Sequence, residues 1–258
     1  MTKNETLGKI LYRGFVPIVI QDLLPPLECL GLVLEAGIEA VEISCRHPEA
    51  LSLIEQAKAQ FPDLAVGAAT LLESGKMRDW VNASGRPVPS IDEVVDAGAD
   101  FLVSLLPFRE QTYAKYAATH AIISGVATPG ECQQALDWGA NILKFVNPRL
   151  LGGPDFFRGL DPATYRAFPF FVTGGMRPEL LPAYVEANIL AVGAGFDLVL
   201  SDDYDRMQES FDAETLRAAL VSYVQALGAA RDQHQADIPF DSRDATAIAR
   251  VSGRCLNV

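Results

Sequence analysis

Histidine, cysteine and long apolar runs are scarce in this chain of 258 residues. The three histidines lie far apart, and the four cysteines form no CxxC pair and have no histidine at ligand spacing. This pattern argues against a zinc site, a histidine-rich metal site and a disulfide framework, so no metal or other cofactor is expected. No run reaches the roughly 18 to 20 apolar residues of a membrane span. The N-terminal segment also lacks the apolar core of a signal peptide, and we predict a soluble, cytoplasmic protein.

Basic residues are also fewer than acidic residues. The chain has 21 lysines and arginines against 33 aspartates and glutamates, which gives a formal net charge of −12 and a pI near 4.7. This balance argues against nucleic acid and against anionic membrane surfaces as partners. A small acidic substrate needs only a local positive site, so the net charge is compatible with one.

Apolar runs of strand length recur along the chain and alternate with amphipathic segments of helical spacing. Such alternation indicates βαβ units and a parallel sheet. A doubly wound open sheet would give the same alternation, but the number of units favours a single-domain (β/α)8 TIM barrel. The expected strands are residues 16–20, 40–45, 64–70, 101–106, 121–126, 142–146, 169–174 and 189–194.

A weak internal repeat supports this interpretation. The segments EAGIEAVEI, DAGADFLVS, DWGANILKF and EANILAV each end a helical pattern at Gly or Asn and then enter an apolar run. Residues of this kind favour the left-handed backbone that closes a helix. The positions expected to adopt it are Gly37, Gly98, Gly139 and Asn188.

Two segments interrupt the alternation of strand-like and helix-like segments. Residues 72–90 are rich in polar and turn residues and exceed the usual length of a strand-to-helix connection. In a barrel, this insertion is expected at the C-terminal face, above any active site. Residues 233–258 form a polar C-terminal extension, so we assign residues 1–232 to the barrel and its N-terminal helix.

A lysine interrupts the apolar run NILKFVN. Because side chains alternate along a strand, Ile142, Lys144 and Val146 share one face. If that face points into the barrel, Lys144 is an isolated amine in an apolar wall. Burial disfavours the charged form of an amine, and a neutral amine attacks ketones to give a Schiff base. The alternative is a structural lysine paired with a carboxylate, and this run alone does not decide between them.

The run AVEISCRH carries a second polar face. Glu42, Ser44 and Arg46 fall on one side of the expected strand, near its C-terminal end, where TIM barrels build active sites. Glu42 could shuttle protons, and Arg46 could hold a substrate carboxylate through two parallel hydrogen bonds. The alternative is a structural ion pair inside the barrel.

Glycine-rich motifs end the last two expected strands. They are VTGGM and VGAG, and barrels often bind phosphate with the loops after these strands. Glycines let backbone N–H groups approach an anion closely. Thr173 is expected over the pocket, and Thr70 holds an equivalent place in the motif GAAT. The glycines predicted to bind substrate are Gly174, Gly175, Gly193 and Gly195.

These motifs, in this order, resemble a known family. From about residue 14 to residue 200, the chain is similar to the 2-keto-3-deoxy-6-phosphogluconate / 4-hydroxy-2-oxoglutarate aldolases, which are class I aldolases on a (β/α)8 barrel. The segments that carry the resemblance are EAGIEAVEISCR, VGAAT, SGVATPGE, GANILKFVNP, VTGGM and ILAVGAG.

The resemblance implies a role for each matching residue. Lys144 stands at the position of the Schiff-base lysine and Glu42 at that of the proton-shuttling glutamate. Arg46 stands at the position of the arginine that holds the pyruvyl carboxylate. Thr70 and Thr173 match threonines that contact substrate. The resemblance also implies a homotrimer that needs no metal.

Several positions depart from the family's usual pattern. Residues 146–148 read VNP, where Phe-Pro is usual, and Leu105 stands where a proline is common. Gly195 aligns with a serine that often helps to bind phosphate, and Gln21 aligns with an arginine present in some members. Arg177, directly after the TGGM motif, is a candidate replacement for these contacts.

The resemblance implies a small-molecule reaction. A 2-keto-3-deoxy (phospho)sugar acid or 4-hydroxy-2-oxoglutarate would be cleaved to pyruvate and an aldehyde. One alternative is a lyase or decarboxylase of the same chemistry on an unphosphorylated 2-keto acid. Another is a non-catalytic barrel that binds a sugar acid. A metal-dependent aldolase is disfavoured by the spacing of the potential ligands.

Overall fold

The computed structural model describes residues 1–20, 23–85, 87–166 and 168–235. Parallel strands pair in chain order and close into an eight-stranded barrel, which confirms the (β/α)8 prediction. The ring closes where β1 pairs with β8. The strands are β1 (Phe15–Val19), β2 (Ala40–Ser44), β3 (Ala65–Ala69), β4 (Phe101–Val103), β5 (Ala121–Gly125), β6 (Ile142–Val146), β7 (Phe170–Thr173) and β8 (Ile189–Gly195).

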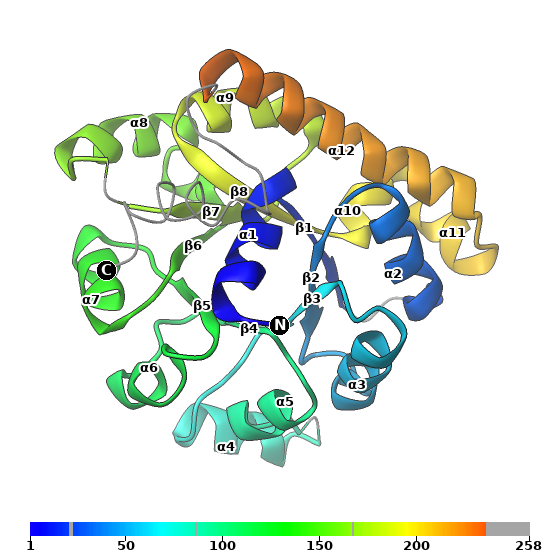
Figure 1. The fold of residues 1–258 in the computed structure, drawn as a ribbon, viewed down its shortest axis with the longest axis horizontal. Helices are drawn as coiled ribbons and strands as arrows, with labels where there is room; N and C mark the ends of the chain where they lie inside the picture. Colours follow the sequence, from blue (N-terminus) through cyan, green and yellow to red (C-terminus); the bar gives the residue numbers. More distant parts are fainter. Residues whose placement is uncertain (21–22, 86, 167, 236–258) are drawn as a thin grey trace.

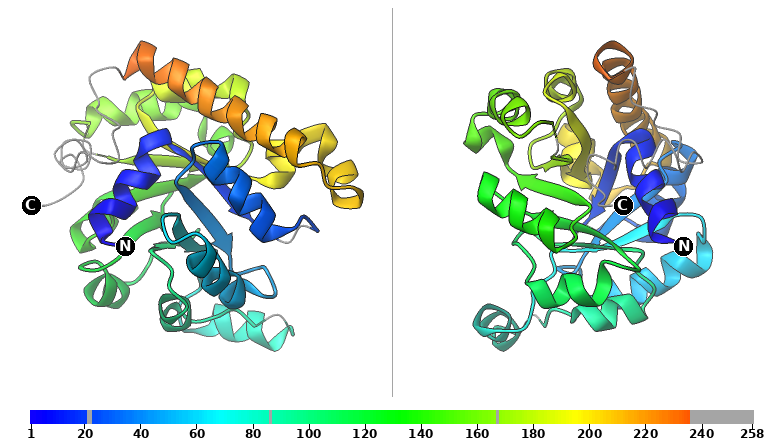
Figure 2. Two further views of the ribbon diagram at one scale, coloured as in Figure 1. Left: turned by 45° about the vertical axis from the view of Figure 1, so that its right-hand side comes forward. Right: turned by 60° about the vertical axis from the view of Figure 1, so that its left-hand side comes forward.

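Helices surround the barrel and connect its strands (Figure 1). The longest of them, α12, runs along the outside and packs against α9 and α2 (Figure 2). The α-helices are α1 (Lys3–Arg13), α2 (Pro26–Glu35), α3 (Ala50–Gln60), α4 (Lys76–Ala83), α5 (Ile91–Asp96), α6 (Glu110–Tyr116), α7 (Pro129–Trp138), α8 (Pro154–Ala163), α9 (Leu181–Glu186), α10 (Phe196–Leu200), α11 (Tyr204–Glu209) and α12 (Ala213–His234). Short 3₁₀ helices are η1 (Pro148–Leu151), η2 (Pro178–Leu180) and η3 (Ser201–Asp203).

Alternating side chains divide the core into two layers. Leu143 and Phe145 of β6 point outward and join the apolar layer between the strands and the helices. Ile142 of the same strand points inward, as period-two alternation predicted. The N-terminal helix α1 covers the end of the barrel where the strands begin, and its Leu7 and Ile10 join the inner layer (Figure 1). One end of the barrel is thus closed, and the C-terminal end remains available for a site.

All eight expected strands are present, with small differences in their bounds. The largest difference is β4, which ends at Val103 instead of continuing to residue 106. The hydroxyl of Ser104 donates to the Leu71 carbonyl and accepts from the Leu106 N–H, at 3.1 and 3.0 Å. These bonds turn the chain out of the sheet and leave Leu105 54% exposed.

The four predicted helix ends adopt left-handed backbone. The φ angles are 76° at Gly37, 99° at Gly98, 113° at Gly139 and 67° at Asn188. Each of these residues therefore reverses the chain direction between a helix and the next strand, which confirms the structural meaning of the sequence repeat.

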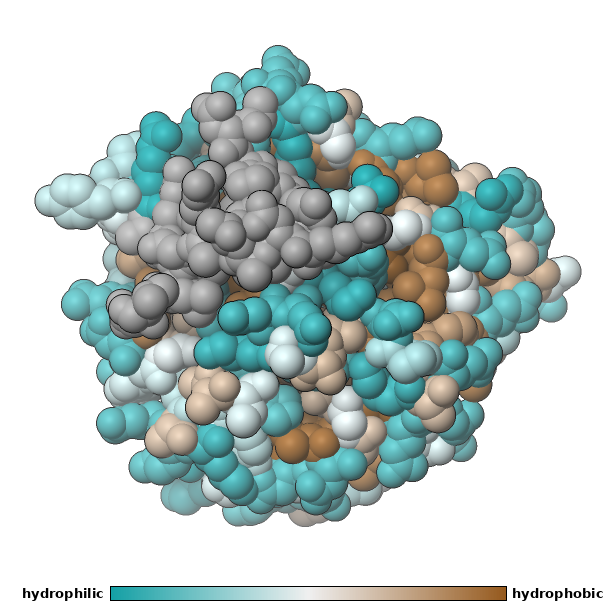
Figure 3. Space-filling model, in the orientation of Figure 1, coloured by the Kyte–Doolittle hydropathy of each residue, from teal (hydrophilic) through white to brown (hydrophobic). Residues whose placement is uncertain are grey.

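Hydrophilic side chains predominate on the face in Figure 3, outside the area drawn in grey. In the described ranges, no helix is both long and apolar enough to cross a membrane.

Gly14 provides a test of the packing between α1 and α12. It has φ 67°, and a Cβ there would overlap the Arg231 guanidinium and lie 2.8 Å from the Leu190 carbonyl oxygen. Left-handed strain and overpacking together should cost Gly14→Ala about 2 to 4 kcal/mol. We therefore expect a Tm about 4 to 16 °C lower by calorimetry.

The matched control is Gly228→Ala in α12. A Cβ at Gly228 meets nothing within 4 Å, and alanine favours the helix, so the Tm should stay or rise slightly. Equal melting temperatures for the two variants would contradict the proposed close packing at Gly14.

Candidate active site

A cavity of about 490 Å³ opens at the C-terminal end of the barrel, and we call it the mouth cavity. Lys144 of β6 and Glu42 of β2 face into it. Eight of the nine predicted site residues line it, so the folded chain brings together positions that are up to 153 residues apart in sequence. The eight are Glu42, Arg46, Thr70, Lys144, Thr173, Gly174, Gly175 and Gly195.

Lys144 and Glu42 form a buried ion pair across the barrel. The Lys144 Nζ lies 2.9 Å from Oε1 and 2.7 Å from Oε2 of Glu42. Their side chains are 7% and 1% exposed. The same Nζ lies 5.2 Å from the centre of the Phe171 ring. Of the two arrangements that the sequence left open, an isolated amine and a lysine paired with a carboxylate, the structure shows the pair, because β2 brings a carboxylate to β6.

This pair has chemical consequences. A carboxylate in contact with an ammonium group can accept its proton and leave the neutral amine, which is the nucleophilic form. The same contact is also compatible with a purely structural ion pair. The amine also lines a cavity at the C-terminal end of the barrel, a placement that a purely structural pair does not need.

A hydrogen-bonded chain positions Arg46 at the rim. The Ser44 hydroxyl lies 2.9 Å from the Thr70 hydroxyl and accepts from Arg46 Nε at 3.2 Å. Thr70 has left-handed backbone, with φ 61°, directly after β3. Ser44 was not among the predicted site residues, although it shares the strand face of Glu42 and Arg46. It links the guanidinium to the end of the neighbouring strand.

Thr173 ends β7, and its hydroxyl donates to the Gly193 carbonyl at 3.0 Å. The hydroxyl oxygen retains lone pairs that can accept a further hydrogen bond. Gly193 is the one predicted site residue that does not line the mouth cavity. A Cβ there would lie 2.9 Å from the Phe171 ring, so this glycine allows that ring to pack inside the barrel. Its connection to the cavity runs through Thr173.

The motif after β7 brings backbone into the mouth cavity. Gly174 and Gly175 have φ of 90° and 73°, which strongly favour glycine at both positions. Asn147 follows β6 with φ 50°, and its side-chain oxygen fills the space where a Gly174 Cβ would project. The unusual residue after the lysine strand is therefore accommodated by the glycine beside it.

The other departures from the family pattern have different locations. Leu105 and Val146 line the mouth cavity and give part of its wall an apolar character. Arg177 directly precedes η2 and does not line the cavity, so the structure does not place it as a replacement ligand. Gln21 lies outside the described residues.

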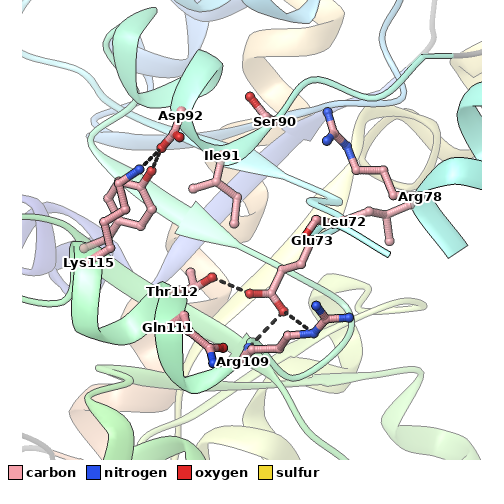
Figure 4. A pocket seen from close by; sticks show the side chains of 12 residues that line it. Leu72, Glu73, Arg78, Ser90, Ile91, Asp92, Arg109, Gln111, Thr112 and Lys115 are labelled. Carbon is pink, nitrogen blue, oxygen red and sulfur yellow. Dashed lines mark hydrogen bonds and ion pairs between the residues drawn. The ribbon is translucent and has the colours of Figure 1, made fainter. Parts of the chain in front are cut away.

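The insertion builds a separate cavity of about 480 Å³ with α5 and α6 (Figure 4). Its charged side chains mostly face one another. Glu73 accepts from the Arg109 N–H at 2.9 Å and from the Thr112 hydroxyl, and Lys115 pairs with Asp92. None of the described residues 72–85 and 87–90 lines the mouth cavity, so this part of the insertion does not roof Lys144 as expected.

None of the three described cysteines, Cys29, Cys45 and Cys132, lines the mouth cavity. Cys45 precedes Arg46, but it points into the outer apolar layer, and burial raises the pKa of its thiol to about 12. It stays protonated at neutral pH and is a poor nucleophile. Among the described residues, no three potential metal-ligating side chains converge.

Comparison with known proteins places the chain in a family. The model of the KDPG and KHG aldolases matches residues 15–210. The chain belongs to the KDPG and KHG aldolase family. Aldolases are carbon–carbon lyases, and membership assigns this class of reaction to the chain.

Curated relatives within the family are distant in sequence. A 2-dehydro-3-deoxy-phosphogluconate aldolase from Pseudoalteromonas atlantica is 25% identical over 81% of this chain and 94% of its own length. A protein of the same name from Treponema pallidum is 28% identical over 70% and 80%.

Solved structures show the same fold. A KDPG aldolase from Legionella pneumophila, with pyruvate captured as a covalent carbinolamine, superimposes with a TM-score of 0.66 at 22% identity. The match covers 84% of this chain and 97% of that chain. At this identity, the similarity supports the (β/α)8 fold but does not identify the substrate. The substrate has to be inferred from the residues that line the mouth cavity.

Proposed function

We propose that this aldolase cleaves a 2-keto-4-hydroxy acid to pyruvate and an aldehyde through a Schiff base on Lys144. The candidate substrates are 2-keto-3-deoxy (phospho)sugar acids and 4-hydroxy-2-oxoglutarate. The observation that carries the proposal is the contact of Lys144 with Glu42 at the floor of an open cavity with Arg46 at its rim. The carbinolamine captured in the Legionella pneumophila relative supports the same chemistry.

Schiff-base formation begins with proton transfer from Lys144 to Glu42. The neutral Nζ attacks the C2 ketone and gives a carbinolamine. Glu42 then returns a proton to the departing hydroxyl, directly or through water, and water leaves as the imine forms. A positioned acid–base of this kind typically contributes about 10²- to 10⁴-fold to the rate.

Cleavage uses the protonated imine as an electron sink. A base removes the proton from the C4 hydroxyl, the C3–C4 bond breaks, and its electron pair moves to the imine nitrogen as the aldehyde leaves. The resulting enamine takes a proton at C3. Water then hydrolyses the imine, which releases pyruvate and restores the lysine.

Substrate orientation comes from the rim of the cavity. Arg46 holds the carboxylate through its guanidinium, whose Nε already bonds Ser44. Thr173 and Thr70 place hydroxyls where they can bond the keto acid. Holding C2 against Nζ in this way can supply several kcal/mol of the barrier. We further propose a homotrimer in the cytoplasm, as the family resemblance implies.

Borohydride reduction with pyruvate tests the proposal directly. We expect reduction to fix a pyruvyl adduct on the peptide that contains Lys144, detected by mass spectrometry. Lys58 is an internal control, because its Nζ also pairs with a carboxylate, 2.7 Å from Asp100 Oδ2, but it does not line the mouth cavity. Labelling of Lys58 to the same extent, or no labelling of Lys144, would contradict the Schiff-base assignment.

A further inference from the structure

The mouth cavity contains a carboxylate at the place where TIM barrels commonly bind phosphate. That place is formed by the loops after the seventh and eighth strands and by a short additional helix. Here, α10 begins directly after β8, and Asp197 lies in its first turn. Asp197 lines the same cavity as Lys144 and the glycine pair of β7. Its negative charge therefore faces the site of any phosphate on the substrate.

Gly195 allows the Asp197 side chain to take this position. A Cβ at Gly195 would overlap the Asp197 Oδ1 and lie 2.9 Å from Ile20 Cδ1. The Gly195 backbone, with φ −70° and ψ 159°, is ordinary extended geometry that any residue adopts. The backbone thus does not require glycine here, and the absence of a Cβ leaves free the space that the exposed Asp197 carboxylate occupies. Gly195 and Asp197 act together to bring an anionic oxygen to the end of β8.

The charges around Asp197 do not neutralise it. Among the residues that the structure describes, none donates a hydrogen bond to its carboxylate or forms an ion pair with it. Among the described residues, the cations that line the mouth cavity are Lys144, already paired with Glu42, and Arg46. Arg149 and Arg177 follow the two neighbouring strands but do not line the cavity. A phosphate would add about 1.5 to 2 negative charges beside Asp197.

A hydroxyl group suits this end of the cavity better. It can donate to the Asp197 carboxylate and also accept from backbone N–H groups of Gly174 and Gly175, which line the same cavity. Ile18, Ile20 and other apolar lining residues offer no charge that would favour an ionic group. The lining therefore combines an acceptor, backbone donors and apolar walls, which match the polyhydroxy end of a neutral sugar aldehyde.

We propose that Asp197 makes this aldolase select 2-keto-4-hydroxy acids whose aldehyde half ends in free hydroxyl groups instead of a phosphate ester. This proposal rests on the Schiff-base function and narrows its substrate class. It separates the chain from the relatives whose names specify phosphorylated acids.

The test compares 2-keto-3-deoxygluconate with its 6-phosphate ester, with pyruvate release measured by a coupled lactate dehydrogenase assay. We expect kcat/KM of the wild type to be at least about tenfold higher for the unphosphorylated acid, as repulsion between close like charges allows. Asp197→Asn keeps the shape of the side chain but removes its charge. We expect the ratio of kcat/KM for the unphosphorylated acid to that for the ester to fall about tenfold or more, mainly because turnover of the ester improves. Asp197→Ser should shift it in the same direction.

Asp202→Asn is the matched control. Asp202 lies in η3, is exposed and does not line the mouth cavity, so its loss changes the net charge equally but leaves the preference unchanged. A wild type that prefers the ester, or an Asp197→Asn preference equal to that of the wild type, would overturn the proposal. Trapping of pyruvate on Lys144 does not depend on the aldehyde half of the substrate. If the adduct forms but the enzyme prefers the phosphate ester, only the proposed role of Asp197 is overturned. Failure to trap pyruvate on Lys144 overturns the proposed function itself.

Discussion

Replacing Lys144 with methionine is expected to abolish both pyruvate release and the adduct trapped by borohydride. Methionine occupies a similar space but has no amine, so no imine forms and the breaking C3–C4 bond has no electron sink. We expect kcat/KM to fall by about 10⁴-fold or more, as when the nucleophile of a covalent enzyme is removed. That loss equals about 5.5 kcal/mol of transition-state stabilisation. The coupled assay measures the decrease, with circular dichroism to verify folding.

Lys58→Met is the control for this substitution. Lys58 lies in α3, where its Nζ donates to the Leu64 carbonyl at 3.1 Å and pairs with Asp100. The substitution breaks a partly buried lysine–carboxylate pair, whose side chains are 19% and 5% exposed. It should leave kcat/KM within about threefold of the wild type, because neither residue lines the mouth cavity. A Lys144→Met variant with activity close to that of Lys58→Met would exclude Schiff-base catalysis at Lys144.

The residues that share a strand face could be predicted from sequence because they depend on local geometry. A strand alternates its side chains whatever its neighbours are, so the grouping of Lys144 with Ile142 and Val146 followed from position alone, while the structure shows that this face points inward. The contact of Lys144 with Glu42 did not, because β2 and β6 are not adjacent in the ring and only closure of the barrel brings them together. The sequence left a paired and an isolated lysine open, and the closed barrel selects the pair.

The loop residues were harder to interpret. The glycines after β7 and β8 predicted an anion-binding end of the cavity, and no period-two rule applies to Asp197 beyond the strand. Its direction depends on where α10 begins and on the room left by Gly195. Likewise, the tight contact of Asn147 with Gly174 links two loops and has no local signal. The sequence thus located Lys144 and Glu42 more reliably than the part of the cavity that we propose selects the aldehyde.

Unfolding measurements on variants of Lys144 and Glu42 should separate the contribution of the pair to stability from its contribution to the reaction. Either Lys144→Met or Glu42→Gln leaves the other group buried without its partner, since the two side chains are 7% and 1% exposed. We expect each single variant to lose about 3 to 5 kcal/mol of the free energy of unfolding, measured by urea denaturation. The double variant removes both charges and should recover most of that loss.

Activity should not follow stability in this cycle. Glu42→Gln retains the amine but has no carboxylate to take its proton, so we expect a decrease in kcat of about 10²- to 10⁴-fold. The double variant should be as stable as either single variant or more stable, and still inactive, because neutralising both groups restores packing but provides no nucleophile. Turnover by a stable double variant would assign the pair to structure alone. Recovery of stability without turnover would instead show that the barrel retains a charged pair at its floor for the reaction, since a neutral pair there would fold equally well.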